Sequence, residues 1–188
     1  MKLINILLIF CFLTSCGDDI FIPKPPTYLR ADLPEHKYTT HEDRCPYTLT
    51  IPEIFSAKQV SDLNGLTCHK DINMGPLNGT IHFSFIEMTK PLAAYVNFAN
   101  DKVDEHKIKA TSINDYKIIN DSNQVYCTFF ELQGNVASPF QFYMTDSVSR
   151  FVSAVIYFNS TPNYDSLKPS LEYLKTDLNY MIENFKWK

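Results

Sequence analysis

The sequence predicts an α+β fold, in which a mostly antiparallel sheet carries helices packed on it. Two observations favour this class. Several segments alternate apolar and polar residues with the period of a half-buried strand. One amphipathic helical segment follows the early strands, and a longer one ends the chain. The resulting order of strand, helix, several strands and helix is typical of antiparallel sheets with helices on them.

The first half of the chain contains two alternating segments and one helix. Residues 47–51 and 81–85 place apolar side chains at every second position, which predicts two strands. Thr89 can cap the helix that follows, and Pro91 is tolerated in a first helical turn. The apolar face of this helix repeats every three or four residues and consists of Leu92, Val96, Ala99 and Val103.

The second half contains further strands and the clearest helix. Residues 113–119 and 125–132 predict two strands, and residues 140–144 and 152–158 predict a hairpin around the turn Thr145-Asp146-Ser147. Asp165 or Ser166 can cap the closing helix. Its apolar stripe is wide enough to cover a sheet face and consists of Leu167, Leu171, Leu174, Leu178, Met181 and Phe185.

The N-terminal residues predict an exported, lipidated protein. Lys2 precedes an apolar run at residues 3–13, and small residues lead to Cys16, a pattern that resembles a bacterial lipoprotein signal peptide. The run is too short to cross a hydrocarbon core of ~30 Å. We therefore expect residues 1–15 to be removed and Cys16 to carry acyl chains. An ordinary secretory signal with an incidental cysteine is the alternative.

The mature chain divides into a tether and one domain. Residues 16–37 form the lipidated N-terminus and tether, which Pro23-Lys24-Pro25-Pro26 stiffens toward polyproline II. Residues 38–188 are expected to form a single globular α+β domain. Asp18 and Asp19 resemble surface-export signals of lipoproteins in the Bacteroidota, but a solvated linker has the same composition, so the membrane face stays open.

Three cysteines remain in the domain: Cys45, Cys68 and Cys127. An exported compartment permits disulfides, but an odd number of cysteines cannot pair fully within one chain. A bridge between Cys45 and Cys68 would stabilise the fold by roughly 3 kcal/mol through loop closure. Three free thiols are the alternative. Cys127 lies in a strand-like segment and is expected to be a buried small hydrophobe.

Motifs of enzymatic or metal chemistry are missing. The sequence contains no HExxH, paired CxxC, GxSxG, SxxK, Walker or GxGxxG pattern. We therefore expect no enzyme activity, no cofactor and no metal site, and no small-molecule substrate is identified. A cryptic hydrolase would require His82 to join a carboxylate and a serine in one deep pocket. Nucleic acid is not an expected partner, because no basic block stands out and the net charge is -4.

Several short blocks of the sequence resemble one protein family, and their order along the chain is more specific than any single block. The longest runs from Gly134-Asn135-Val136 to Thr145-Asp146-Ser147, and the others include Cys45-Pro46-Tyr47, Ile81-His82-Phe83-Ser84 and Ile182-Glu183-Asn184-Phe185-Lys186-Trp187. Together they resemble the gliding motility lipoprotein GldD family of the Bacteroidota over nearly the whole mature chain. The family usually has Arg-Gly-Tyr-Phe-Arg where residues 26–30 stand here, and commonly an aromatic residue where His69 stands.

The resemblance implies a cell-envelope lipoprotein required for gliding motility and type IX protein secretion, acting as a non-catalytic accessory or assembly component. Only Cys16 transfers as a functional residue. The implied partners are the membrane, through the acyl anchor, and other envelope proteins of the gliding and secretion machinery. We favour the outer membrane. The element order also resembles PsbP-like sandwiches.

The alternative function is an envelope lipoprotein that binds a glycan or peptidoglycan fragment. Its motivation is the aromatic content outside the strand and helix cores, including Tyr28, Tyr38 and Tyr164. Aromatic faces with polar tips suit such ligands.

Overall fold

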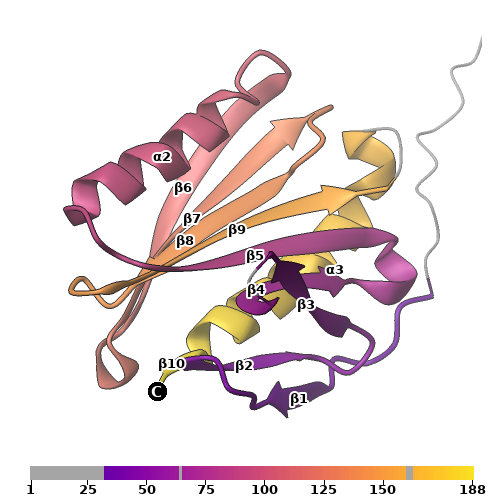
Figure 1. Ribbon diagram of the computed structural model, residues 1–188. Coiled ribbons are helices and arrows are strands. Elements are labelled where there is room, and N and C mark those ends of the chain that lie inside the picture. The colour runs from indigo at the N-terminus through magenta and orange to yellow at the C-terminus, as the bar shows by residue number, and fades with distance from the viewer. Residues whose placement is uncertain (1–31, 64, 160–162) are drawn as a thin grey trace, which may run out of the picture.

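The computed structural model describes residues 32–63, 65–159 and 163–188 (Figure 1). Cys16 and the predicted signal segment therefore lie outside the described residues. Within the described ranges, no helix combines the length and the apolar character that a membrane span requires.

Seven strands form the main sheet, in the order β3-β4-β5-β9-β8-β7-β6. Every pair of neighbours in this order is antiparallel, so the predicted fold class is confirmed. The strands are β3 (Ser56–Asp62), β4 (Gly65–Asn73), β5 (Gly79–Glu87), β6 (Ala110–Asn120), β7 (Val125–Gly134), β8 (Phe140–Thr145) and β9 (Arg150–Phe158).

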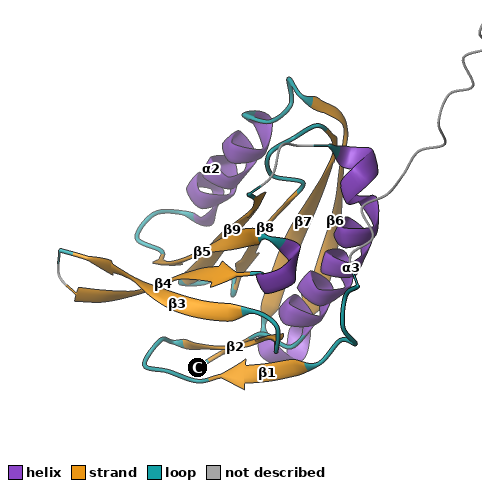
Figure 2. Ribbon diagram, turned by 90° about the vertical axis from the view of Figure 1, so that its right-hand side faces the viewer, coloured by secondary structure: helices purple, strands orange, loops and turns teal. Residues whose placement is uncertain are grey.

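A smaller sheet and two helices cover the main sheet. The small sheet has the order β1-β2-β10, from β1 (Tyr38–His41), β2 (Tyr47–Pro52) and β10 (Lys186–Trp187). Helix α3 (Tyr164–Glu183) contacts β2, β6 and β7. Helix α2 (Leu92–Asp104) lies on the opposite face of the main sheet (Figure 2). The result is a layered sandwich with the main sheet in the middle.

The hydrophobic core fills the layer between the main sheet, α3 and β2. Phe83, Ala154, Phe142 and Phe129 stand in cross-strand register along one row of the sheet. Tyr47 of β2 packs its ring 5.4 Å from that of Phe83. Full burial of one such side chain contributes about 1.5–3 kcal/mol. Helix α3 adds the buried apolar side chains of Leu171, Leu174, Leu178, Met181 and Ile182.

Helix α2 packs more thinly than α3. Its buried residues are Ala99 and Val103, while Leu92 and Val96 are half-buried. These four residues form the face that the sequence predicts, so that prediction is confirmed. Most of the remaining helix surface is exposed.

The cap predicted for this helix is wrong. The helix begins at Leu92, and Pro91 occupies the N-cap position without a side-chain hydrogen bond. Thr89 lies too far upstream and instead donates its backbone N–H to the Tyr95 hydroxyl at 2.8 Å. The tyrosine therefore fixes the turn before the helix.

The cap of the closing helix also differs from the prediction. Asn163, one residue before the helix, accepts a hydrogen bond from the backbone N–H of Ser166 at 3.2 Å. Asp165 and Ser166 themselves lie inside the first turn of α3. A capping side chain must precede the helix to reach its unpaired N–H groups.

The hairpin between β8 and β9 is confirmed. One carboxylate oxygen of Asp146 accepts the backbone N–H groups of Val148, Ser149 and Arg150 at 2.8–2.9 Å. Burial alone would raise the pKa of Asp146, but these hydrogen bonds hold it below its ordinary value. The predicted turn thus rests on one aspartate.

Candidate functional site

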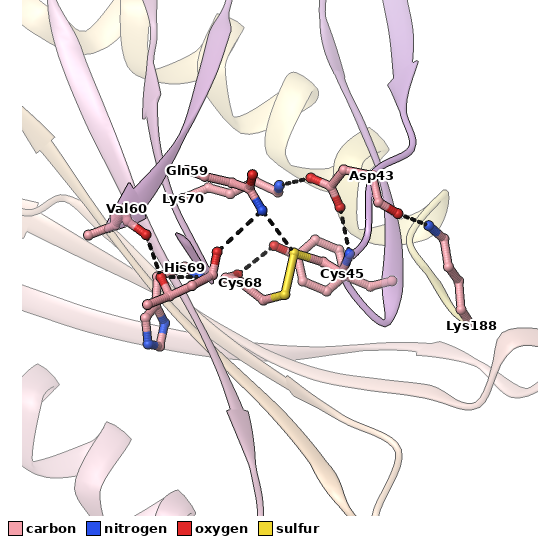
Figure 3. Close-up of polar contacts among 10 residues, drawn as sticks. Asp43, Cys45, Gln59, Val60, Cys68, His69, Lys70 and Lys188 are labelled. Carbon is pink, nitrogen blue, oxygen red and sulfur yellow. Dashed lines mark hydrogen bonds and ion pairs between the residues drawn. A yellow bond between two sulfur atoms is a disulfide. The ribbon is translucent and has the colours of Figure 1, made fainter. Parts of the chain in front are cut away.

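A cleft of about 820 Å³, here called the polar cleft, opens beside the small sheet and the edge of the main sheet. The loop between β1 and β2 lines it together with β3, β4 and the C-terminus (Figure 3). Most of its lining is polar or charged, and the lining residues are Glu42, Asp43, Arg44, Cys45, Gln59, Cys68 and Lys188.

Cys45 and Cys68 are bonded in the wall of the polar cleft, with their Cα atoms 5.4 Å apart. Cys45 lies just before β2 of the small sheet, and Cys68 lies in β4 of the main sheet, so the bond joins the two sheets. The Tyr47 hydroxyl donates to the Cys68 carbonyl at 2.7 Å, and the Gln59 amide lies 3.3 Å from the Cys45 sulfur. The two sheets are therefore joined here by a covalent bond and by side-chain hydrogen bonds.

Lys70 is a buried lysine that pairs with Asp43, a residue of the polar cleft. The residue is 4% exposed, and its ammonium group forms an ion pair with the Asp43 carboxylate. It also lies 5.5 Å from the centroid of the Tyr47 ring. Asp43 accepts the backbone N–H of Cys45 at 2.9 Å, and the Lys188 ammonium donates to the Asp43 carbonyl at 2.7 Å. Asp43 thus ties the loop, the disulfide and the C-terminus to one buried lysine.

The carboxyl group of Asp43 is held in its ionised form. Partial burial alone would raise its pKa, but hydrogen bonds from Lys70 and from the Cys45 N–H hold the pKa below its ordinary value. Since the folded-state pKa is the lower one, the stabilisation is present above the unfolded value of ~3.9. It is lost as the pH falls through the folded-state value.

The charged side chains that line the polar cleft are partly paired. Lys70 and Asp43 neutralise each other, which leaves neither available as a free acid or base. No histidine lines the cleft. In the described part of the chain, no group of His, Cys, Asp and Glu side chains is arranged to hold a metal ion. The exposed Glu42, Arg44 and Lys188 offer charges of both signs to a polar partner.

A second polar cluster, here called the Asp177 clasp, joins the first described residues to α3. The Asp177 side chain is fully buried, and one of its oxygens lies 2.7 Å from His36 Nδ1 and 3.0 Å from the donating Tyr38 hydroxyl. His36 stacks on Tyr173 at 4.2 Å, and Tyr38 stacks on Tyr180 at 3.6 Å. Burial raises the pKa of Asp177, whereas the hydrogen bonds from His36 and Tyr38 oppose the rise.

Contact with the domain begins upstream of β1. Leu33 packs against the main core, and the Tyr173 hydroxyl donates to the Pro34 carbonyl at 3.0 Å. These residues fall within the segment that composition assigns to the tether. The last residues of that segment are thus fastened to α3.

His82 belongs to neither cluster. Its Nδ1 atom is 2.7 Å from a carboxylate oxygen of Asp71, and both side chains are about half exposed. Neither residue lines the polar cleft. The pair is open to solvent and is not enclosed in the deep pocket that a hydrolase interpretation requires.

The tyrosines that motivate glycan binding have other contacts. Tyr38 belongs to the Asp177 clasp, and Tyr164 packs against the main core. Tyr28 lies outside the described residues. Both described tyrosines are half-buried.

Two residues of these clusters match no sequence motif. Asp177 does leave a signal, because it falls within the apolar stripe of α3, three residues after Leu174 and four before Met181. A carboxylate in that position is expected to have a buried partner. Lys70 leaves no such signal, since its strand lacks a clear apolar alternation.

We expect the native protein to contain one bonded cysteine pair and one protected thiol. Alkylation without reductant should leave Cys127 unlabelled, because burial excludes the reagent and raises the pKa of the thiol. A peptide map should recover Cys45 and Cys68 in linked peptides, and urea should expose Cys127 to labelling. Labelling of Cys45 or Cys68 before reduction would contradict the pairing.

The substitution Asp43→Asn should lower the free energy of unfolding by about 2–3 kcal/mol at pH 7, because it leaves the Lys70 charge buried without a carboxylate. Urea denaturation measures this change. The loss should shrink as the pH falls below about 4, where the carboxylate of the unfolded chain becomes protonated, and it should disappear once the pH is below the lower folded-state pKa of Asp43.

The matched control is the double variant Asp43→Asn/Lys70→Met. It should recover most of the lost stability, because no buried charge remains. Equal destabilisation of the single and double variants would show that the ion pair is not the cause.

Comparison with known proteins adds a structural neighbour and a family. The solution structure of cyanobacterial PsbP (CyanoP) from Synechocystis sp. PCC 6803 is 9% identical in sequence, with a TM-score of 0.42. The alignment covers 87% of this chain and 100% of that chain. No curated protein matches.

The family comparison covers far more than half of the chain. The family model described as gliding motility lipoprotein GldD matches residues 18–187, a range that includes the Asp177 clasp and every lining residue of the polar cleft except Lys188. A lipoprotein family implies a membrane-anchored protein of the cell envelope. The chain therefore belongs to the gliding motility lipoprotein GldD family.

Proposed function

We propose that this protein is an outer-membrane lipoprotein, acylated at Cys16, that gliding motility and type IX protein secretion require. It acts as a non-catalytic accessory or assembly component of that machinery. The observation that carries the proposal is the family match over residues 18–187.

The polar cleft supports a role in recognition. Its volume of about 820 Å³ and its exposed charges suit a polar surface of another envelope protein. The disulfide and the Lys70–Asp43 ion pair hold its walls in place, so little conformational freedom is lost on binding. The partner would be another gliding or type IX secretion protein of the envelope.

The Asp177 clasp supports a role for the anchor in positioning. A flexible tether raises the local concentration of a domain for membrane partners. Because His36 and Tyr38 are held against α3, the tether leaves the domain at one fixed point. The anchor then limits which surfaces of the domain can reach a partner in or on the same membrane.

The proposal predicts two separable losses. Deletion of the gene should abolish spreading on surfaces and secretion of type IX cargo, and normal secretion in the deletion strain would reject the role.

Cys16→Ala should move the domain from the membrane fraction to the soluble fraction, since acyl chains are the proposed attachment.

The chain offers a matched control in Cys11, which lies inside the apolar run. Cys11→Ala should leave acylation and membrane fractionation unchanged. Mass spectrometry of the mature N-terminus should detect acylated Cys16 in the wild type and in this control. Undiminished fractionation of Cys16→Ala, after its signal segment is removed, would show that a protein partner holds the domain instead.

A further inference from the structure

Strand β6 is a free edge of the main sheet. No described strand pairs beyond it (Figure 2). From Ser112 to Asn120 it pairs with β7 without a register shift. The opposite edge, β3, is interrupted between Gln59 and Ser61, a type of irregularity that protects sheet edges. The outer side of β6 therefore offers regular, unpaired backbone N–H and C=O groups.

The side chains of β6 divide between the two faces of the sheet. Lys117 and Ile119 line a groove of about 310 Å³ beneath α2, so the odd-numbered residues face α2. Tyr116 faces α3, where its hydroxyl donates to Asn179 at 3.0 Å. Asp115 and Lys117 are exposed, and neither forms an ion pair with another described residue. Ile119 is a large apolar residue that is 59% exposed.

We propose that β6 pairs antiparallel with β6 of a second copy of this chain, about a two-fold axis at Tyr116. A two-fold axis perpendicular to the sheet leaves the α2 faces of both copies on the same side of the combined sheet. Directly opposed residues must then point to the same face, which requires the axis to pass through a residue position and not between two residues. With the axis at Tyr116, Asp115 of each copy stands opposite Lys117 of the other, and Ile113 stands opposite Ile119. Opposite charges and paired apolar side chains in directly opposed positions stabilise an antiparallel ladder.

The neighbouring registers lack this complementarity. An axis at Asp115 places two carboxylates opposite each other, and an axis at Lys117 places two ammonium groups opposite each other, which disfavours both. The register at Tyr116 also covers the exposed Ile119 with Ile113 of the second copy. Charge pattern and apolar exposure thus select the same alignment.

Pairing through one strand edge is expected to be weak in solution. It buries less than the ~1,200 Å² of total surface typical of stable interfaces. The membrane anchor that the lipoprotein family implies confines all copies to one plane, which raises their effective concentration. We therefore place this pairing in the envelope, and it does not depend on the proposed role in secretion.

Charge reversal tests the pairing in intact envelopes. Two full-length copies carry the two halves of a split luciferase at their C-termini, and luminescence is normalised to the amount of each copy. Wild-type copies should give a signal. Asp115→Lys paired with itself, and Lys117→Asp paired with itself, should each lower it by about tenfold, because both cross-strand ion pairs become repulsive.

The decisive arm combines the two reversed copies. An Asp115→Lys copy with a Lys117→Asp copy restores both ion pairs and should restore the signal, which misfolded variants could not do. A wild-type signal at background, reversed copies that associate as well as wild type, or a mixture that stays dark would each overturn the proposal.

Discussion

The position of the segment before β1 depends on the hydrogen bonds that the buried carboxylate of Asp177 accepts. This carboxylate lies on the face of α3 that otherwise carries apolar side chains, and it binds both His36 and Tyr38. A buried carboxylate without such partners would destabilise the fold strongly. Its two hydrogen bonds and the two ring stacks around it fasten the segment of His36 and Tyr38 to α3. The described residues just before β1 are therefore held against the core.

The molecule has a closely packed side and a more open side. On the α3 side, the small sheet, α3 and the main sheet enclose the aromatic core, and the Cys45–Cys68 bond joins the two sheets. On the other side, α2 buries little, and the β6 edge and the groove beneath α2 remain uncovered. The α3 side is therefore closely packed, whereas the α2 side leaves a sheet edge and a groove exposed.

The sequence patterns predict the parts of this structure that depend on apolar periodicity. The strands at the centre of the sheet place apolar residues at every second position, and both helices place them every three or four positions. These patterns are clear because one face of each element is buried. Strands β1 and β3 are exposed and polar, so their sequences carry no alternation that would reveal them. The N-cap is the residue that directly precedes a helix. An error of one or two residues in the predicted start of the helix therefore assigns the cap to the wrong residue.

The polar clusters depend on tertiary contacts and are harder to predict. Lys70 meets Asp43 only because the loop before β2 folds onto β4, and nothing in the local sequence specifies that contact. Asp177 is different, because its position within an apolar helical stripe marks it as a buried carboxylate before its partners are known.

Amide hydrogen exchange of the lipid-anchored protein tests the central claim most directly. In Asp177→Ala, the amides of β1 (Tyr38–His41) should exchange at least about tenfold faster than in the wild type, because the clasp that holds this segment is lost. Asp165→Ala, which alters an exposed carboxylate of the same helix, should leave them unchanged. If β1 keeps its full protection in Asp177→Ala, the buried carboxylate does not fasten the segment of His36 and Tyr38 to α3.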